Sequence, residues 1–139
     1  MAGKIRDVMT SEPTTCAASD SVEDAAKAMR DGDFGAVIVV DEDRVAGIVT
    51  DRDIAIRVVA EGKDAGDTEL RQVASDTVET LSPDDSLDDA VQKMRDADVR
   101  RLPVVEGSRP VGIVSIGDLA VARDERSALA DISAASPNN

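Results

Sequence analysis

The sequence Gly47-Ile48-Val49-Thr50-Asp51-Arg52-Asp53 returns as Gly112-Ile113-Val114-Ser115-Ile116-Gly117-Asp118, at an offset of 65 positions (112 − 47). The same offset holds without a gap through the preceding residues, in the pairs Ser21/Ser86, Asp24/Asp89, Met29/Met94, Val39/Val104 and Arg44/Arg109. This register indicates two copies of one supersecondary unit. Because each copy is too short to bury its apolar face well alone, we expect both to pack as one body with a pseudo-twofold axis.

The sequence pattern of each copy predicts a strand, a helix, two further strands and a closing helix. In the first copy, apolar residues recur at helical spacing after Ser21, and the apolar runs 36–40 and 45–49 predict a hairpin. We therefore assign the chain to the α/β (α+β) class, as two β-α-β-β-α repeats. The first repeat is placed at 4–62, the second at 69–126 and a flexible C-terminal tail at 127–139.

The composition narrows the class of protein. A chain of 139 residues with 42% hydrophobic content suffices for one globular domain, and no apolar run approaches the roughly 20 residues of a membrane span. No signal-peptide core follows Met1, so we expect a soluble, cytoplasmic protein with no membrane partner. The net charge of −13 and the single aromatic residue, Phe34, argue against nucleic acid as a partner, because nucleic-acid-binding proteins present basic and stacking surfaces.

Catalytic and metal chemistry has few candidate residues. The chain has no histidine, so no Ser/His or Cys/His pair can form and the commonest metal ligand is missing. Its single cysteine, Cys16, excludes an internal disulfide and is interpreted as a small buried hydrophobic residue. We therefore expect no catalytic residue, no metal site and no cofactor, and an enzyme is the least favoured function.

The repeated motif Thr/Ser-x-x-Asp lies where a strand meets a helix, at Thr50 to Asp53 and at Ser115 to Asp118. One interpretation is a capping box, in which the hydroxyl and the acid stabilise the start of the helix. The other is a nucleotide site, because a helix start attracts phosphate and an acid just inside it binds ribose hydroxyls. A glycine before each motif favours the nucleotide site, since it lets the backbone approach a ligand closely.

The basic pair Arg100-Arg101 opens an apolar strand of the second copy, which is unusual in so acidic a chain. The pair either binds an anionic group of a ligand or forms ion pairs with nearby carboxylates such as Asp96 and Asp98.

The closing helices are apolar around most of their circumference. The first contains Ile54, Ile56, Val58 and Val59, and the run 119–122 repeats this pattern more weakly. Such a helix needs cover on more than one side, which a small protein obtains by dimerising. We therefore expect a homodimer.

The helix, the apolar strand, the sequence Gly-Ile-Val-[Thr/Ser]-x-x-Asp and the following helix, present in tandem, resemble the cystathionine-β-synthase (CBS) domain pair, or Bateman module. The resemblance covers roughly residues 4–122, and the sequences at 50–54 and 100–105 are typical of small stand-alone bacterial members. It implies a non-catalytic regulatory module that binds an adenine nucleotide (AMP, ADP or ATP) or S-adenosylmethionine between the repeats. It also implies a flat, disc-like homodimer.

The resemblance implies a role for each residue of the two motifs. Asp53 and Asp118 would hold ribose hydroxyls, and Thr50 and Ser115 would contact the phosphate. Positive charge for the phosphate would come from Arg101, together with Arg100. The adenine would lie between aliphatic walls, formed by Val37, Ile48, Leu102 and Ile113.

The chain also departs from the family pattern. Gly35-Ala36 replaces the arginine pair in the first copy, so we expect the two sites to differ, with charge missing from the one that relies on Ala36. Some hypoxic-response members bind zinc through cysteine and histidine, and this property is not expected in a chain without histidine. The alternative function is a dimeric protein-interaction scaffold of the same fold, in which the Thr/Ser-x-x-Asp motifs serve only as helix caps.

Overall fold

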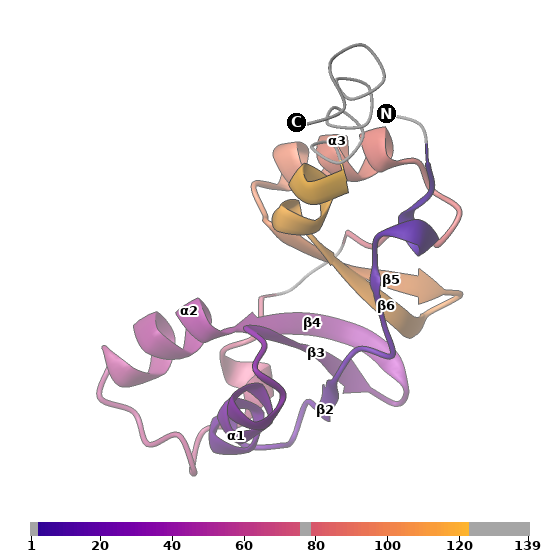
Figure 1. Cartoon of the computed structure of the whole chain (residues 1–139). Coiled ribbons are helices and arrows are strands. Elements are labelled where there is room, and N and C mark those ends of the chain that lie inside the picture. The colour runs from indigo at the N-terminus through magenta and orange to yellow at the C-terminus, as the bar shows by residue number, and fades with distance from the viewer. Residues whose placement is uncertain (1–2, 76–78, 123–139) are drawn as a thin grey trace.

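The structure, a computed structural model, describes residues 3–75 and 79–122 (Figure 1). This part of the chain forms two halves, each with a three-stranded sheet covered by helices. The arrangement confirms the predicted α/β class and its two similar repeats. The tail predicted at 127–139 lies outside the described residues.

The first half contains β2 (Thr15–Ala17), α1 (Val22–Gly32), β3 (Ala36–Asp41), β4 (Arg44–Thr50) and a closing helix formed by α2 (Asp51–Ile54) and the π-helical segment η2 (Ala55–Val59). Its sheet has the order β2-β3-β4, with β2 parallel and β4 antiparallel to β3. The second half contains α3 (Leu87–Ala97), β5 (Arg101–Glu106), β6 (Arg109–Ser115) and a closing helix at 116–122. Its sheet has the order β1-β6-β5.

The long helices begin where the sequence predicts. Ser21 Oγ accepts a hydrogen bond from the backbone N–H of Asp24 at 3.1 Å, and Ser86 Oγ does the same for Asp89 at 3.0 Å. Each helix has 11 residues and ends at an aspartate with left-handed backbone, Asp33 or Asp98. Within 3–75 and 79–122, no helix has both the length and the apolar character to cross a membrane.

The N-terminal segment crosses to the second half. Strand β1 (Thr10–Ser11) pairs antiparallel with β6, placing Thr10 opposite Ile113. Ahead of it, the 3-10 turn η1 (Ile5–Asp7) is anchored by the backbone N–H of Ile5, which donates to the carbonyl of Asp85 at 2.9 Å. In Figure 1 this indigo segment runs along the orange half of the molecule.

The segment that precedes the second repeat makes the reciprocal crossing. The backbone N–H of Leu70, in the 3-10 turn η3 (Leu70–Gln72), donates to the carbonyl of Asp20 at 2.8 Å, and the N–H of Ser75 donates to the carbonyl of Ile48 at 3.1 Å. The packing units are therefore not the sequence repeats. The boundaries predicted at 4–62 and 69–126 follow the duplication, whereas each half takes its first segment from the other repeat.

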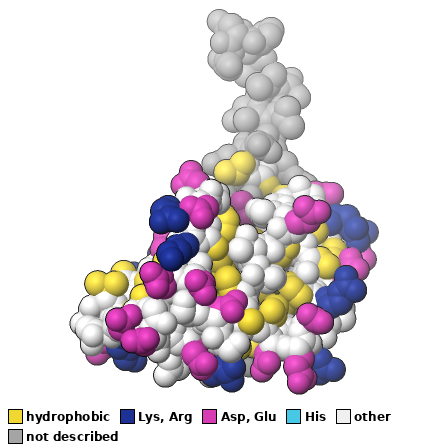
Figure 2. All heavy atoms as spheres, turned by 90° about the horizontal axis from the view of Figure 1, so that it is seen from below, with side chains coloured by type: hydrophobic (Ala, Val, Ile, Leu, Met, Phe, Trp, Pro, Cys, Tyr) yellow, Lys and Arg dark blue, Asp and Glu magenta, His cyan; other side chains and the backbone are white. Residues whose placement is uncertain are grey.

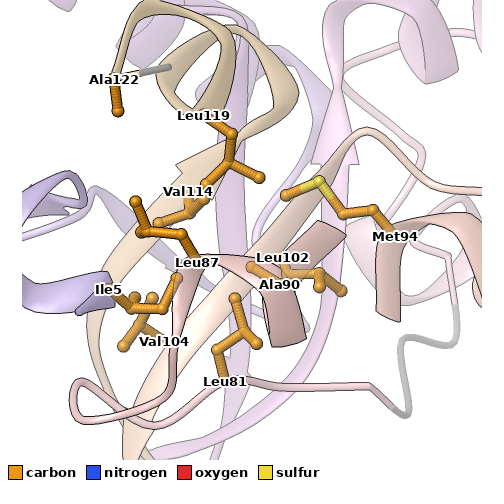
Figure 3. Close-up of a cluster of buried hydrophobic side chains, with 10 residues drawn as sticks. All are labelled: Ile5, Leu81, Leu87, Ala90, Met94, Leu102, Val104, Val114, Leu119 and Ala122. Carbon is orange, nitrogen blue, oxygen red and sulfur yellow. The ribbon is translucent and has the colours of Figure 1, made fainter. Parts of the chain in front are cut away.

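Two separate hydrophobic cores follow from this exchange. In each, a helix and one face of a sheet close over the segment from the other repeat. The first core contains Ala18, Val22, Ala25, Met29, Val37, Val39, Val49, Val58, Leu70 and Val73. The second, drawn in Figure 3, contains Ile5, Leu81, Leu87, Ala90, Met94, Leu102, Val104, Val114, Leu119 and Ala122. The crossing residues Ile5 and Leu70 are both 0% exposed. Each is therefore a fully buried part of the core formed mainly by the other repeat.

A third buried region lies between the two sheets, where β4 is in contact with β5 and β6. Ile38 and Ile48 are buried at 0% and 6% exposure, yet neither belongs to a core cluster. Pro103, also buried, lies in β5, the last strand in the order β1-β6-β5, as expected for a residue that has no N–H to donate to a neighbouring strand. The faces of the sheets turned away from the cores thus form the contact between the halves.

The two motif glycines serve the exchange. A Cβ on Gly47 would lie 2.4 Å from the carbonyl oxygen of Ser75, and a Cβ on Gly112 would lie 2.5 Å from Met9 Sδ and 3.1 Å from the carbonyl oxygen of Thr10. Both are approached by the segment from the other repeat. The prediction that they also let the backbone approach a ligand stays a prediction.

The exchange predicts unequal effects of alanine at the two glycines. Gly47→Ala should lower the free energy of unfolding by about 2 kcal/mol, because its new methyl group would overlap backbone that can move only with the whole segment. Gly112→Ala should cost less, since the first atom in its way is the flexible Met9 thioether. Urea unfolding of both variants measures the difference. A greater loss for Gly112→Ala would contradict the packing described here.

Candidate functional site

A cleft of about 350 Å³ lies between the two repeats. This volume is within the range of roughly 300–1,000 Å³ found for small-molecule sites. Its lining comprises Thr10, Glu12, Pro13 and Thr14 of the crossing segment, Phe34, Gly35, Ala36 and Ile38 of the first half, and Arg101, Ile113, Ser115 and Asp118 of the second. The cleft brings together Arg101, Ile113, Ser115 and Asp118 from the residues that the sequence predicts as a site.

Ser115 and Asp118 form a reciprocal capping box. The backbone N–H of Ser115 donates to Asp118 Oδ2 at 2.9 Å, and the N–H of Asp118 donates to Ser115 Oγ at 3.1 Å. The helix-cap interpretation is therefore realised in these hydrogen bonds. In the part of the chain that the structure describes, Asp118 Oδ1 accepts no hydrogen bond, so this oxygen is available to a hydroxyl donor in the cleft.

Thr50 and Asp53 form the same box, at 2.9 and 3.1 Å, but do not line this cleft. Here a cation stands beside the acid: Arg57 Nε lies 3.9 Å from Asp53 Oδ1. The Arg57 guanidinium also donates to the carbonyl oxygen of Val73 at 3.2 Å, which ties it to the crossing segment. The matching position of the second repeat is the buried Ala122. The two motifs therefore differ in the charge beside their acids.

Arg101 begins β5 and lies opposite Ser115 in the register of the sheet. A Cβ on Gly35 would lie 3.3 Å from Arg101 Nη2 and 3.0 Å from Asp51 Oδ2, so both groups border that glycine. Ala36 occupies the corresponding place opposite Thr50. The guanidinium of Arg101 thus lines the cleft from one repeat, and the other repeat supplies a methyl group.

The ion pairs considered as the alternative for the arginine pair do not form. Within the described residues, neither Arg100 nor Arg101 makes an ion pair with Asp96 or Asp98. The Asp96 carboxylate instead accepts a hydrogen bond from Gln92 Nε2 at 2.8 Å. Arg100 is exposed and does not line the cleft; its backbone carbonyl accepts from the N–H of Ile116 at 2.7 Å.

The structure moves three of the four predicted aliphatic walls away from the cleft. Val37 and Leu102 are 1% and 0% exposed and belong to the two cores. Ile48 bridges to Ser75 and also lies outside the cleft lining. Only Ile113 lines the cleft as expected. For Val37 and Leu102 the cause is that successive side chains of a strand point to opposite faces, and β3 and β5 turn these two positions inward. Ile48 is instead buried in the region between the two sheets.

The sequence reasoning missed six lining residues: Thr10, Glu12, Pro13, Thr14, Phe34 and Ile38. Ile38, next to Val37, is on the cleft face. The run 36–40 is apolar throughout, so no sequence pattern distinguishes its two faces. Phe34 also lines the cleft, and Gly32 makes room for it, because a Cβ there would lie 2.0 Å from the Phe34 ring. The single aromatic ring of the chain is thus beside the cleft.

Cys16 lies apart from the cleft, in β2, and is half-buried against the first core rather than fully buried. Burial, with a smaller effect of Asp20 and Asp24, raises the pKa of its thiol and so disfavours the thiolate. Across 3–75 and 79–122, no three Cys, Asp or Glu side chains gather as a metal-binding group.

The CBS domain model of known protein families matches residues 5–60 and 70–125, which together span most of the chain. The chain belongs to the CBS domain family. The match also reproduces the internal duplication, with one CBS domain in each repeat.

Relatives of similar size share this arrangement. The CBS pair is 40% identical over 117 residues to the CBS domain-containing protein YhcV of Bacillus subtilis, covering 84% of this chain and 83% of that protein. It is 35% identical over 116 residues to Hypoxic response protein 1 of Mycobacterium tuberculosis, covering 83% and 81%. Among solved structures, it is similar to the CBS domain pair of protein MJ0100 in complex with 5′-methylthioadenosine and S-adenosyl-L-methionine, with a TM-score of 0.80, 27% identity and coverage of 91% and 99%.

The assignment of Leu102 to a core and Ile113 to the cleft predicts that alanine substitutions at these two positions lower the stability by different amounts. Leu102→Ala should lower the free energy of unfolding by about 3 kcal/mol, because it empties part of a closed core. Ile113 is partly exposed and does not belong to that core, so Ile113→Ala should cost less than half as much. Urea unfolding tests both. Equal losses would mean that Ile113 is a core residue rather than a wall of the cleft.

Proposed function

We propose that this CBS pair is a non-catalytic regulatory module that binds an adenosine-containing ligand in the cleft beside Asp118. The ligand class comprises AMP, ADP, ATP and S-adenosylmethionine. One observation carries the proposal: a carboxylate oxygen and an arginine, both without a partner among residues 3–75 and 79–122, meet apolar side chains in one cleft of about 350 Å³. Because these ligands are metabolites of the cell interior, the proposal also places the protein in the cytoplasm.

The proposed contacts assign one part of the ligand to each kind of group. Asp118 Oδ1 would accept a hydrogen bond from a ribose hydroxyl, since a carboxylate oxygen is a strong acceptor. Arg101 would bind an anionic group such as a phosphate or carboxylate. The base would lie against Ile38, Ile113 and the Phe34 ring, which offer apolar surface and an aromatic face for stacking.

The adenosine complex of the MJ0100 domain pair supports the choice of ligand class. That complex shows that a CBS pair of similar fold binds adenosine compounds. In the present cleft, Asp118 and Arg101 are the polar groups that would bind such a compound. The first motif is proposed as the weaker site, because Arg57 already stands beside Asp53 and Ala36 takes the place of an arginine.

A matched pair of variants tests this function. Asp118→Ala and Asp53→Ala each remove one capping box, so each should cost about 1 kcal/mol of stability without ligand. For the wild type, a ligand at a hundred times its Kd adds about 2.7 kcal/mol, or about 5–10 °C in Tm for a domain of this size. We expect Asp118→Ala to abolish most of this ligand-dependent shift and Asp53→Ala to retain most of it.

Thermal unfolding with millimolar adenosine, AMP, ATP or S-adenosylmethionine provides the measurement. If none of these compounds raises the wild-type Tm, the ligand-binding function is excluded. If both variants lose the shift equally, the cleft beside Asp118 is not the preferred site.

A second candidate function is a dimeric interaction module, and a specific surface favours it. Among the described residues, the large exposed hydrophobic side chains all lie on the two closing helices: Ile56 (47%), Val59 (70%), Ile116 (52%) and Val121 (56%). Exposed hydrophobic side chains that cluster in this way indicate a surface for association with another protein. We propose that they pair two copies of the chain, and this dimer is compatible with ligand binding in the cleft.

The dimer predicts that one charge on a closing helix separates the copies. Sedimentation of the wild type at micromolar concentration should give twice the chain mass of 14.6 kDa. Ile56→Asp should give the monomer mass, because burying an unpaired carboxylate is strongly unfavourable. Ser108→Asp, on the exposed β5–β6 turn, adds the same charge and should leave the dimer intact. A monomeric wild type would contradict the prediction.

A further inference from the structure

Glu12 stands at the crossing between the two sheets. Strand β1 ends at Ser11 beside β6, and β2 begins at Thr15 beside β3, so residues 12–14 bridge the halves and line the cleft. Glu12 has φ of 52°, a left-handed conformation that is unfavourable for a residue with a Cβ. Its side chain is exposed, and nothing in the described part of the chain forms a hydrogen bond or ion pair with its carboxylate.

The charges that line the cleft are unequal. Arg101 is its basic residue, whereas Glu12 and Asp118 are both acidic. The Asp51 carboxylate borders the same edge, next to Gly35 and Arg101. The described lining therefore offers one guanidinium to an anionic group, together with two carboxylates, and a third carboxylate lies at its edge. Outside the cleft, Figure 2 shows further Asp and Glu side chains spread over the visible face of a chain whose net charge is −13.

We propose that Glu12 is a specificity-determining residue that selects the ligand by charge. The cleft accepts an adenosine compound whose 5′ substituent bears one phosphate or a positive charge, and it disfavours di- and triphosphates. The inference rests on the proposed adenosine site and goes beyond it by choosing among its ligands.

The physical reason is that Arg101 neutralises one anionic group and that the described residues of the lining supply no second cation. Each further phosphate would lie in a cleft that is also lined by Glu12, and its negative charge would be repelled by the Glu12 carboxylate. Screening does not remove this repulsion, because the Debye length is about 10 Å at 0.1 M salt. A cationic substituent, such as a sulfonium or ammonium group, is attracted by the same carboxylate.

Isothermal titration of the full chain with adenosine, AMP, ATP and S-adenosylmethionine tests the proposal on Glu12→Gln. The substitution keeps the size of the side chain and removes its charge. We expect ATP to bind roughly five- to tenfold more tightly and AMP about twofold more tightly, with adenosine unchanged and S-adenosylmethionine a few-fold weaker. The gain for ATP should shrink at about 1 M salt, where the Debye length falls to about 3 Å.

The chain offers a matched control in Glu42→Gln. Glu42 is also an exposed glutamate with φ of 52°, but it lies in the β3–β4 turn and does not line the cleft. Glu42→Gln should therefore leave the ratio of ATP to AMP affinity unchanged. An equal change in both variants would assign the effect to net charge and overturn the role of Glu12.

The outcomes also separate this inference from the proposed function. If the wild type binds AMP but Glu12→Gln leaves the ATP to AMP ratio unchanged, the selectivity role fails and the adenosine site stands. If the wild type binds none of the adenosine compounds, both fail. Tighter ATP binding in Glu12→Gln alone supports both.

Discussion

The reciprocal exchange of the two leading segments is the constraint on which the rest of the structure depends. Ile5 fills the core of the second half and Leu70 fills the core of the first, and both are fully buried. Each is held by backbone hydrogen bonds to the half that receives it. Because neither core closes without the segment from the other repeat, the two repeats fold as one cooperative body. The motif glycines Gly47 and Gly112 keep the room that this exchange needs.

The exchange also builds the cleft. Residues 10–14 leave the sheet of one half and enter the sheet of the other, and most of this crossing segment lines the cleft. A ligand bound there would contact the crossing and both halves at once. Its binding energy would therefore add to the stability of the whole chain.

The duplication produces two motifs with the same internal hydrogen bonds, and a few substitutions make them unequal. Arg101 corresponds to Ala36, and Arg57 corresponds to Ala122. One motif therefore lies in a cleft lined by Arg101, and its acid has an oxygen without a partner among the described residues, while the other has a cation already beside its acid. Both motifs form the capping box, so both helices begin in the same way although the charges beside the two motifs differ.

The sequence alone determined the duplication, the order of elements, the helix starts and the motif residues Ser115 and Asp118, because these depend on local periodicity and on spacing along the chain. It also placed Arg101 at the start of its strand. Only the tertiary structure decided that the leading segments exchange, that Gly47 and Gly112 face backbone, and that Val37 and Leu102 belong to the cores while Ile38 and Phe34 reach the cleft. An unbroken apolar strand such as 36–40 carries no alternation to show which face meets the core, so that choice depends on what packs against each side. The crossing contacts, such as those of Ile5 with Asp85 and Leu70 with Asp20, join residues far apart in the sequence, so they depend on the packing of the whole chain and no local pattern records them.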